Sequence, residues 1–208
     1  MSILGLTIGN SIAGRGVPAT RVRAGEHALE FAALFARLDT NARLLSAGSF
    51  PWVTQNNCWR FFAAADDDVR AGDLVSTADK TCLLYADQSH SIGGVCAYRA
   101  FFALRVNVTD LAFERYPDDA WPAGGITANL KHSPYATGIS AHFWKANEAT
   151  AATADGRTEQ SSAFLVAQLR SDIAPGYLVS IDDRFYSFDG FDVRAHDGLV
   201  VIKMERVK

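Results

Sequence analysis

Two nine-residue segments of this chain nearly repeat each other. The first, DVRAGDLVS, begins at Asp68, and the second, DIAPGYLVS, begins at Asp172. Five of the nine positions are identical, and Val69 and Ile173 are a like-for-like pair. The two segments lie 104 positions apart (172 − 68), which is half of the 208 residues. A repeat at this spacing predicts that the two halves of the chain contain the same structural unit.

The likeness extends to both sides of the two segments. Upstream, residues 61–63 (FFA) lie over residues 165–167 (LVA) at the same offset. Downstream, after a short shift, two further segments match: LLYAD from Leu83 with YSFDG from Tyr186, and FFALRVNV from Phe101 with VVIKMERV from Val200. The pattern predicts duplicated or paired similar barrels. Coincidence is the alternative, because glycine-initiated strands of this kind are common in small barrels.

The repeated glycine has a physical role at the start of each strand. Gly72 and Gly176 follow a turn, where a positive φ is inexpensive only for glycine. In the strand that follows, side chains alternate between two faces. Leu74 and Ser76 are therefore expected on one face and Val75 on the other, with Leu178, Ser180 and Val179 arranged in the same way.

One helix is predicted in the first half, from Glu26 to Leu38, with the sequence EHALEFAALFARL. Apolar residues recur in it at three- and four-residue spacing, and it contains four alanines, the best helix formers.

The rest of the chain favours short antiparallel strands. Hairpin turns are expected at Asp155–Gly156, Asp182–Asp183 and Asp197–Gly198. The fold class is therefore predicted as mainly β, with one or two small antiparallel β-barrels or sandwiches and the single helix. The segment 114–125, rich in Pro, Gly and Asp, is the expected boundary between a first part (1–113) and a second (126–208).

Composition narrows the classes of function. The net charge is −3, and lysine and arginine are scattered along the chain, which disfavours sequence-specific DNA binding. Three cysteines without a C-x-x-C spacing favour reduced thiols in a cytoplasmic setting. The first residues lack the pattern of a secretory signal, and no apolar stretch is long enough for a membrane span, so no membrane partner is expected.

The second half resembles the head-closure (stopper or neck) proteins of tailed bacteriophages. The residues that carry the resemblance are Pro175, Gly176, Ile181–Asp182, Tyr186 and the final VVIKMERV. The first half looks like a sibling of the same barrel and keeps the Gly-Asp pair at Gly72–Asp73. The second half departs from that pair, because Tyr177 follows Gly176.

The resemblance implies a structural virion protein without enzymatic activity or cofactor. Such proteins form a ring of six or twelve copies, assembled in the host cytoplasm, between the portal or an adaptor and the tail. The ring lines or closes the channel through which genomic DNA passes without sequence-specific binding, and the net negative charge is compatible with a DNA conduit. Tail-terminator, adaptor and baseplate barrels are the related alternatives.

Exposed tips and an aromatic anchor are the expected contacts with neighbours. The interface candidates are Trp121 in the 114–125 segment, and Asp155, Gly156, Asp197 and Gly198 at two hairpin tips.

A β-rich hydrolase or a carbohydrate-binding module is the alternative function. A hydrolase would use Cys58 with His90, His132 or His142 as base, although no signature joins them. A carbohydrate-binding module would use tryptophans as a stacking face, namely Trp52, Trp59, Trp121 and Trp144. The acidic cluster at Asp66–Asp68 and Asp73 does not match a calcium loop, and we interpret it as a solvated turn. No metal is expected.

Overall fold

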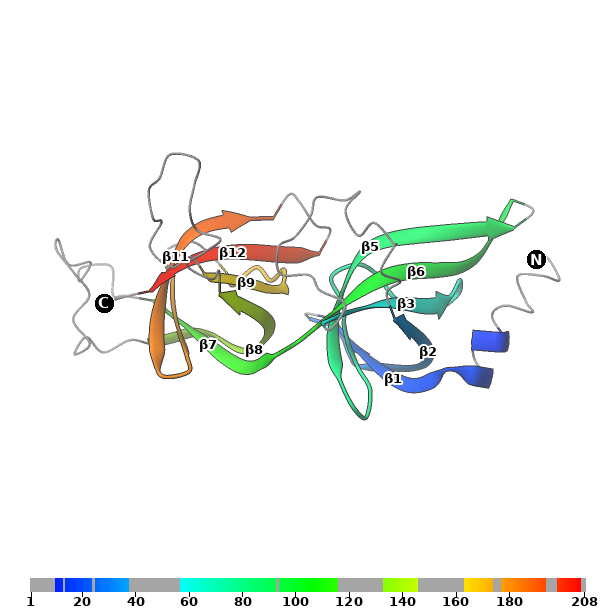
Figure 1. The fold of residues 1–208 in the computed structure, drawn as a ribbon, viewed down its shortest axis with the longest axis horizontal. Helices are drawn as coiled ribbons and strands as arrows, with labels where there is room; N and C mark the ends of the chain where they lie inside the picture. The colour runs from blue at the N-terminus through cyan, green and yellow to red at the C-terminus, as the bar shows by residue number, and fades with distance from the viewer. Residues whose placement is uncertain are drawn as a thin grey trace. The chain divides into compact units, whose positions relative to one another are not determined.

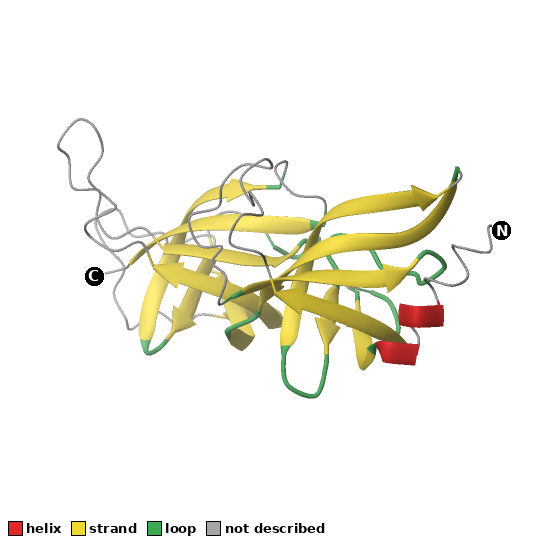
Figure 2. Cartoon of the chain, turned by 45° about the vertical axis from the view of Figure 1, so that its right-hand side comes forward, coloured by secondary structure: helices red, strands yellow, loops and turns green. Residues whose placement is uncertain are grey.

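The computed structural model describes residues 10–12, 14–23, 25–37, 57–92, 94–115, 133–145, 163–173, 177–193 and 198–206. These residues form antiparallel strands and a short helical segment at 10–12 and 14–15 (Figures 1 and 2). The strands of the first half are β1 (Val17–Val22), β2 (Leu29–Arg37), β3 (Cys58–Ala64), β4 (Leu74–Ser76), β5 (Thr81–Ile92) and β6 (Val95–Arg105). Those of the second half are β7 (Val108–Arg115), β8 (Ser133–Lys145), β9 (Ala163–Gln168), β10 (Tyr177–Ile181), β11 (Arg184–Asp192) and β12 (Leu199–Arg206).

Each half closes into a six-stranded antiparallel barrel. Around the first barrel the strand order is β1-β2-β3-β6-β5-β4, and around the second it is β7-β8-β9-β12-β11-β10. The two orders are the same when β1 is matched with β7, β2 with β8, and so on to β6 with β12. The mainly β, barrel-forming fold predicted from the sequence is confirmed, and the repeated segments lead into equivalent strands, β4 and β10.

The strand registers extend the equivalence to single residues. Val75 on β4 lies opposite Cys82 on β5, and Val179 on β10 lies opposite Tyr186 on β11. The offset of 104 therefore continues through both hairpins (179 − 75 and 186 − 82). The short shift expected after the repeat is wrong, because the same number of residues separates the paired positions in both halves (82 − 75 and 186 − 179). Cys82, not Leu83, corresponds to Tyr186.

The last strand of each barrel is matched at a different offset. Cys82 pairs with Arg105, and Tyr186 pairs with Arg206, so Arg105 corresponds to Arg206. The two final strands thus do correspond to each other, but their alignment differs by two residues from the expected match of Phe101 with Val200. The β5–β6 hairpin is three residues longer than β11–β12, counted between these paired positions (105 − 82 against 206 − 186).

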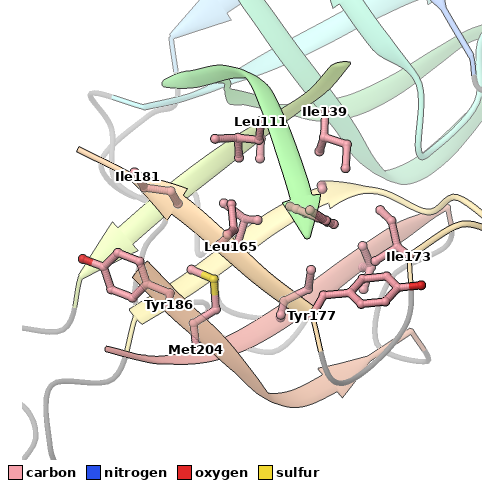
Figure 3. Close-up of a cluster of buried hydrophobic side chains, with 14 of the residues drawn as sticks. Leu111, Ile139, Leu165, Ile173, Tyr177, Ile181, Tyr186 and Met204 are labelled. Carbon is pink, nitrogen blue, oxygen red and sulfur yellow. The ribbon is translucent and has the colours of Figure 1, made fainter. Parts of the chain in front are cut away.

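Both barrel interiors are filled with apolar side chains. In the first barrel Phe61 packs edge-on against Phe31, Phe35 and Phe101, with ring centroids 5.1–6.0 Å apart. The second interior, shown in Figure 3, is built from aliphatic and aromatic residues that include Leu111, Leu165, Tyr177, Tyr186 and Met204. Each barrel therefore has a hydrophobic core of its own.

Large and small residues are exchanged between equivalent core positions. In the first barrel Trp59 pairs with Ala103 across β3 and β6. The equivalent residues of the second barrel are Ala163 and Met204, which belong to its core cluster. One barrel thus places the large side chain on the third strand and the other places it on the sixth, which compensates volume within the same part of the interior.

The helix predicted from Glu26 to Leu38 is wrong, because Leu29–Arg37 forms β2. The segment contains an apolar pattern of period two as well as one of helical spacing: Phe31, Ala33 and Phe35 all contact the core cluster. Helix propensity favours alanine-rich segments, but β2 gains backbone partners on both sides, from β1 and β3. Sheet pairing and burial of alternate residues outweigh the local preference.

The passage from one barrel to the next lies earlier than the expected 114–125 boundary. Contacts divide the chain into Met1–Val106 with Arg194–Leu199, and Asn107–Val193 with Val200–Lys208. The strand β7 begins at Val108, directly after the first barrel ends at Arg105. Residues 116–125 lie outside the described residues.

The hairpin expected at Asp182–Asp183 is confirmed. Ile181 pairs with Arg184, so the turn between β10 and β11 has two residues. Both aspartates have positive φ, 51° and 57°, as a type I′ turn requires.

Candidate functional site

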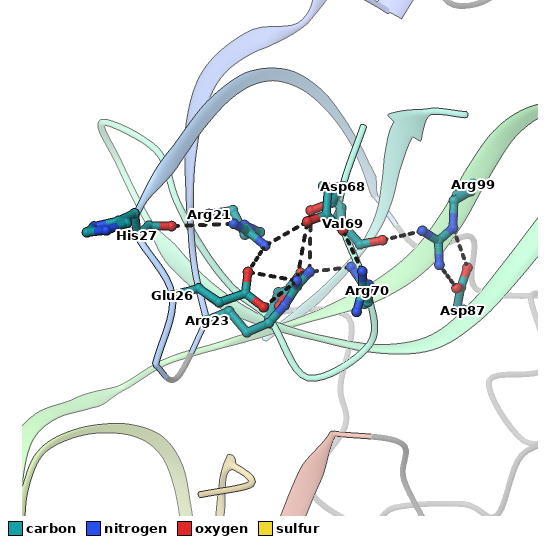
Figure 4. A network of polar contacts seen from close by, with 10 residues as sticks. Arg21, Arg23, Glu26, His27, Asp68, Val69, Arg70, Asp87 and Arg99 are labelled. Carbon is teal, nitrogen blue, oxygen red and sulfur yellow. Dashed lines mark hydrogen bonds and ion pairs between the residues drawn. The ribbon is translucent and has the colours of Figure 1, made fainter. Parts of the chain in front are cut away.

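An arginine–carboxylate cluster lies at one end of the first barrel (Figure 4). It consists of Arg21, Arg23, Glu26, Asp68, Arg70 and Asp73. The two arginines come from the end of β1 and the residue after it, and Glu26 follows the turn at Gly25, whose φ is 80°. The aspartates come from the segment between β3 and β4, so the cluster joins two loops that are distant in sequence.

Asp73 is the most buried carboxylate of the cluster, with 1% of its surface exposed. Arg23 donates to both of its oxygens, from Nε to Oδ1 at 2.6 Å and from Nη2 to Oδ2 at 2.9 Å. The backbone N–H of Arg70 also donates to Asp73, at 2.8 Å. The bond to Asp73 raises the pKa of Arg23, and this bidentate pair is the strongest geometry available to an arginine.

Arg21 is itself buried, with 4% of its surface exposed. Its Nη1 donates to Glu26 at 2.9 Å and to Asp68 at 3.3 Å, and its Nη2 donates to the backbone oxygen of His27 at 3.4 Å. Arg23, and to a smaller extent Arg21, hold the pKa of Glu26 and of Asp68 below their ordinary values. Three guanidiniums face three carboxylates, so the cluster is neutral and compensates its own charges.

The acidic segment at residues 66–73 is held to the end of β1 by ion pairs. The interpretation as a solvated turn is wrong for Asp73, which is buried. Asp68 and Asp73 bind arginines, and Asp67 accepts a hydrogen bond from the N–H of Ala64 at 2.9 Å. Burial raises the pKa of Asp67. In the part of the chain that the structure describes, no group of three acidic, histidine or cysteine side chains is arranged to hold a metal ion.

The same end of the second barrel is closed by aromatic rings. Arg21 lies opposite Val75, and the residue opposite Val179 is Phe113. Phe113 packs against Phe188 with ring centroids 4.9 Å apart, and Tyr177 lies 6.1 Å from Phe188. Tyr177 stands where the first barrel has Asp73. The departure from the Gly-Asp pair is therefore explained, because Tyr177 belongs to the aromatic set and Asp73 to the ionic one.

Cys58 is placed for packing, with its thiol on the outer side of β3 and none of its surface exposed. Its Sγ lies 3.5 Å from the hydroxyl of Tyr85, and burial raises the pKa of the thiol to about 11. Of the histidines considered as its base, His90 stacks on Tyr98 in the same barrel, His142 is buried on β8, and His132 lies outside the described residues. A neutral, buried thiol lacks the thiolate form that a nucleophile needs.

The outer face of the β5–β6 hairpin carries stacked rings and an arginine. His90 stacks on Tyr98 with centroids 4.6 Å apart, and Phe62 contacts Tyr98 edge-on at 6.0 Å. Arg60 lies over the ring of Phe102, 4.6 Å from its centroid, and donates to Gln88 at 2.7 Å. Burial lowers the pKa of Arg60.

The tryptophans that the structure describes do not form one stacking face. Trp59 packs against the core of the first barrel, and Trp144 packs on Phe164 in the second, 5.6 Å between centroids. Trp52 and the interface candidate Trp121 lie outside the described residues, as do Asp155, Gly156 and Asp197. Gly198 precedes β12 with a φ of 72°, a conformation that favours glycine.

Sequence reasoning missed Arg21 and Arg23. The available signal was their alternation in TRVR directly before a glycine turn, together with an acidic segment that the repeat places at the start of β4. The pairing of β1 with β4, which brings these two signals together, cannot be read from either segment alone.

Comparisons with known proteins give no relative. No family model matches the chain, and neither a curated protein nor a solved structure matches it. Among the described residues, no helix is long and apolar enough to cross a membrane.

Proposed function

We propose that this chain is a structural protein of the neck of a tailed bacteriophage. It works as one member of a ring that joins the portal or an adaptor to the tail, and the ring lines or closes the DNA channel. The proposal follows the resemblance of the two halves to head-closure barrels, and the duplicated barrel supports it at the level of fold.

One observation carries the proposal: the side chains that could act as nucleophiles or ligands are used for packing and ion pairing instead. The apolar cores occupy both interiors, Cys58 is buried against Tyr85, and the acidic segment is bound by arginines. What the described chain offers to other molecules is therefore outer surface. Rigid barrels with usable outer surfaces suit a protein whose task is to be held between neighbours.

The test is binding of the full-length chain to a purified portal ring and, separately, to tail proteins encoded near its gene. Negative-stain microscopy should show an added ring of density on one face of the portal. The variant Cys58→Ala should bind equally well, whereas a thiol hydrolase would lose turnover with the same change. Failure to bind any portal, adaptor or tail protein would overturn the proposal.

A further inference from the structure

The first barrel carries three cations around one of its two ends. They are Arg37 at the end of β2, Lys80 directly before β5 and Arg105 at the end of β6. Antiparallel pairing brings these strand ends together around the start of β3, at the end of the barrel opposite to the arginine–carboxylate cluster. We call these three residues the first cationic mouth.

The second barrel has a cation at each of the equivalent positions. The second cationic mouth consists of Lys145 at the end of β8, Arg184 at the start of β11 and Arg206 at the end of β12. Register and offset match the members of the two mouths one to one: Arg37 with Lys145, Lys80 with Arg184, and Arg105 with Arg206. The opposite ends of the two barrels share no such likeness, because one is closed by ion pairs and the other by aromatic rings.

The cations continue the inward-facing series of their strands. Phe35 and Phe143, two residues before Arg37 and Lys145, pack against the two cores. Since side chains alternate across a strand, the next member of each series lies at the rim of the barrel interior. The Nζ atom of Lys80 is 5.0 Å from the ring centroid of Phe35, and that of Lys145 is 5.8 Å from the centroid of Phe143. An ammonium group therefore lies over the equivalent ring in each barrel.

Most of these charges have no counter-ion in the described part of the chain. The exposed members that form no ion pair with a described residue are Arg37, Lys145, Arg184 and Arg206. Lys80 binds Asp79 at 2.7 Å, but the side chain of Asp79 is 71% exposed, so water screens this pair. Asp182 and Asp183 in the β10–β11 turn are exposed and likewise form no ion pair with a described residue. Three like charges at one rim repel each other, and a bound anion would remove that repulsion.

We infer that the two cationic mouths bind the phosphate groups of a nucleic-acid backbone without reading its sequence. The same arrangement of charge occurs on two tandem units, and a polymer that repeats one anionic group suits a site that is itself repeated. Four of the six members are arginines, which bind phosphate through two parallel hydrogen bonds. In the first mouth the rings of Phe35 and Trp59 pack against the core, so they are not free to stack on bases.

The inference rests on the proposed function, because that function brings genomic DNA close to the subunits. It adds the residues through which DNA would be contacted. The negative net charge of the chain is compatible with such a contact, since the cations are gathered at one end of each barrel and the affinity is expected to be weak and dependent on salt.

The test is fluorescence anisotropy of the full-length chain with labelled DNA duplexes of two unrelated sequences. Both duplexes should bind with equal affinity, and the affinity should fall by about tenfold or more between about 50 and about 200 mM NaCl. The variant Arg37→Gln with Arg206→Gln removes one cation from each mouth. It should weaken binding by about fivefold or more and lower the slope of log affinity against log salt by about two.

The matched control is Arg70→Gln with Arg170→Gln, which removes the same charge outside the mouths. Arg70 is paired with Asp68, and Arg170 with Asp172. This control should bind DNA like the unmodified chain, because neither guanidinium belongs to a mouth.

Three results would overturn the inference. The first is an unchanged anisotropy at about 100 µM protein in about 50 mM NaCl, where non-specific backbone binding is measurable. The second is an equal loss of affinity in the control, which would show that net charge alone acts. The third is displacement of the DNA by poly-glutamate at an equal concentration of charges, which would assign the mouths to an acidic protein. A chain that docks on the portal ring but gives any of these results would keep the neck function and lose this contact alone.

Discussion

Arg21 and Phe113 occupy the same position in two barrels of the same design. Each lies on the first strand of its barrel, opposite a valine of the fourth strand, Val75 or Val179. Around Arg21 the barrel end is closed by ion pairs, and around Phe113 it is closed by aromatic rings. One architecture thus uses two different chemistries to close the same end, and the following changes test that difference.

Replacing Arg21 should destabilise the first barrel selectively. Arg21→Ala removes a buried cation and leaves Glu26 and Asp68 with fewer partners, so we expect a loss of about 2 kcal/mol. Urea-dependent hydrogen exchange should show earlier opening of β1 and β4, with β7 and β10 little affected. Arg184→Ala, at the exposed first position of β11, is the matched control and should change stability by less than about 0.5 kcal/mol. Equal loss in both barrels would contradict the prediction.

The cluster should also give the first barrel an acid-sensitive component of stability. Because the folded-state pKa values of Glu26 and Asp68 lie below their ordinary values of 4.5 and 3.8, their contribution is present above those values. It is lost as pH falls through the lowered values. The variant Glu26→Gln with Asp68→Asn should therefore be less stable than the parent near neutral pH, and the difference should vanish once the pH lies below the lowered pKa values of both carboxyls.

Asp67 is the internal control for the direction of this effect. Burial raises its pKa above 3.8, so its charged form is disfavoured in the folded barrel. Asp67→Asn should leave the barrel as stable as the parent, or more stable, near neutral pH, and this advantage should disappear in acid. Urea titrations at a series of pH values measure both effects, and the same sign for the two variants would refute the assignment.

Thiol labelling should separate the three cysteines. Burial raises the pKa of Cys58 to about 11 and that of Cys82 to about 12, whereas Cys96 is only half-buried on β6. Under native conditions near pH 8, iodoacetamide should modify Cys96 first, and Cys58 and Cys82 should react only after unfolding. Peptide mass spectrometry gives the rates. Rapid labelling of Cys58 in the folded chain would reopen the hydrolase hypothesis.

The first barrel has its large core residue on β3 and the second has it on β12. Two substitutions that move the large residue from β3 to β6 should therefore compensate each other. Trp59→Ala should cost about 3 kcal/mol by leaving a cavity, and Ala103→Met alone should cost about 1–2 kcal/mol by overpacking. Together they reproduce the combination of Ala163 and Met204 in the second barrel. The double variant should therefore be more stable than the sum of the two losses by at least about 1 kcal/mol, measured in a double-mutant cycle. Strict additivity would show that the two positions do not share space.

The β10–β11 turn contains a removable strain. Asp182 and Asp183 both have positive φ, which is unfavourable for residues with a side chain. Asp183→Gly should stabilise the second barrel by about 0.5 kcal/mol, because glycine suits the second position of a type I′ turn. Ser180→Gly, in the adjoining strand, should instead destabilise it. Thermal unfolding of the two variants compares them directly, and a destabilising Asp183→Gly would argue against the turn type.

Most of the barrel architecture could be predicted from the repeat in the sequence. The matches around Phe61 and Leu165, and around Val75 and Val179, identify equivalent strands because buried positions tolerate few changes of size and polarity. The β2 helix prediction failed because Phe31, Ala33 and Phe35 fit both a helical and an alternating pattern. Only the neighbouring strands decide between them.

The charged barrel end was less accessible to sequence reasoning than the strands. Arg23 and Asp73 are 50 residues apart, and they meet because β1 closes the barrel against β4. Barrel closure is a non-local event, so no periodicity within either segment records it. The substitution of Tyr177 for Asp73 was visible in the sequence, but its meaning depends on Phe113 and Phe188, which lie on two other strands.

Two tandem barrels with one strand order face a particular hazard, which is the exchange of equivalent strands during folding. If β7 took the place of β1, Phe113 would enter a site lined by carboxylates, and Asp73 would lose its guanidinium partner. If β1 took the place of β7, Arg21 would be buried among rings without a counter-ion. Both mispaired states are penalised, so the divergence at these positions disfavours the exchange of β1 and β7 between the two barrels.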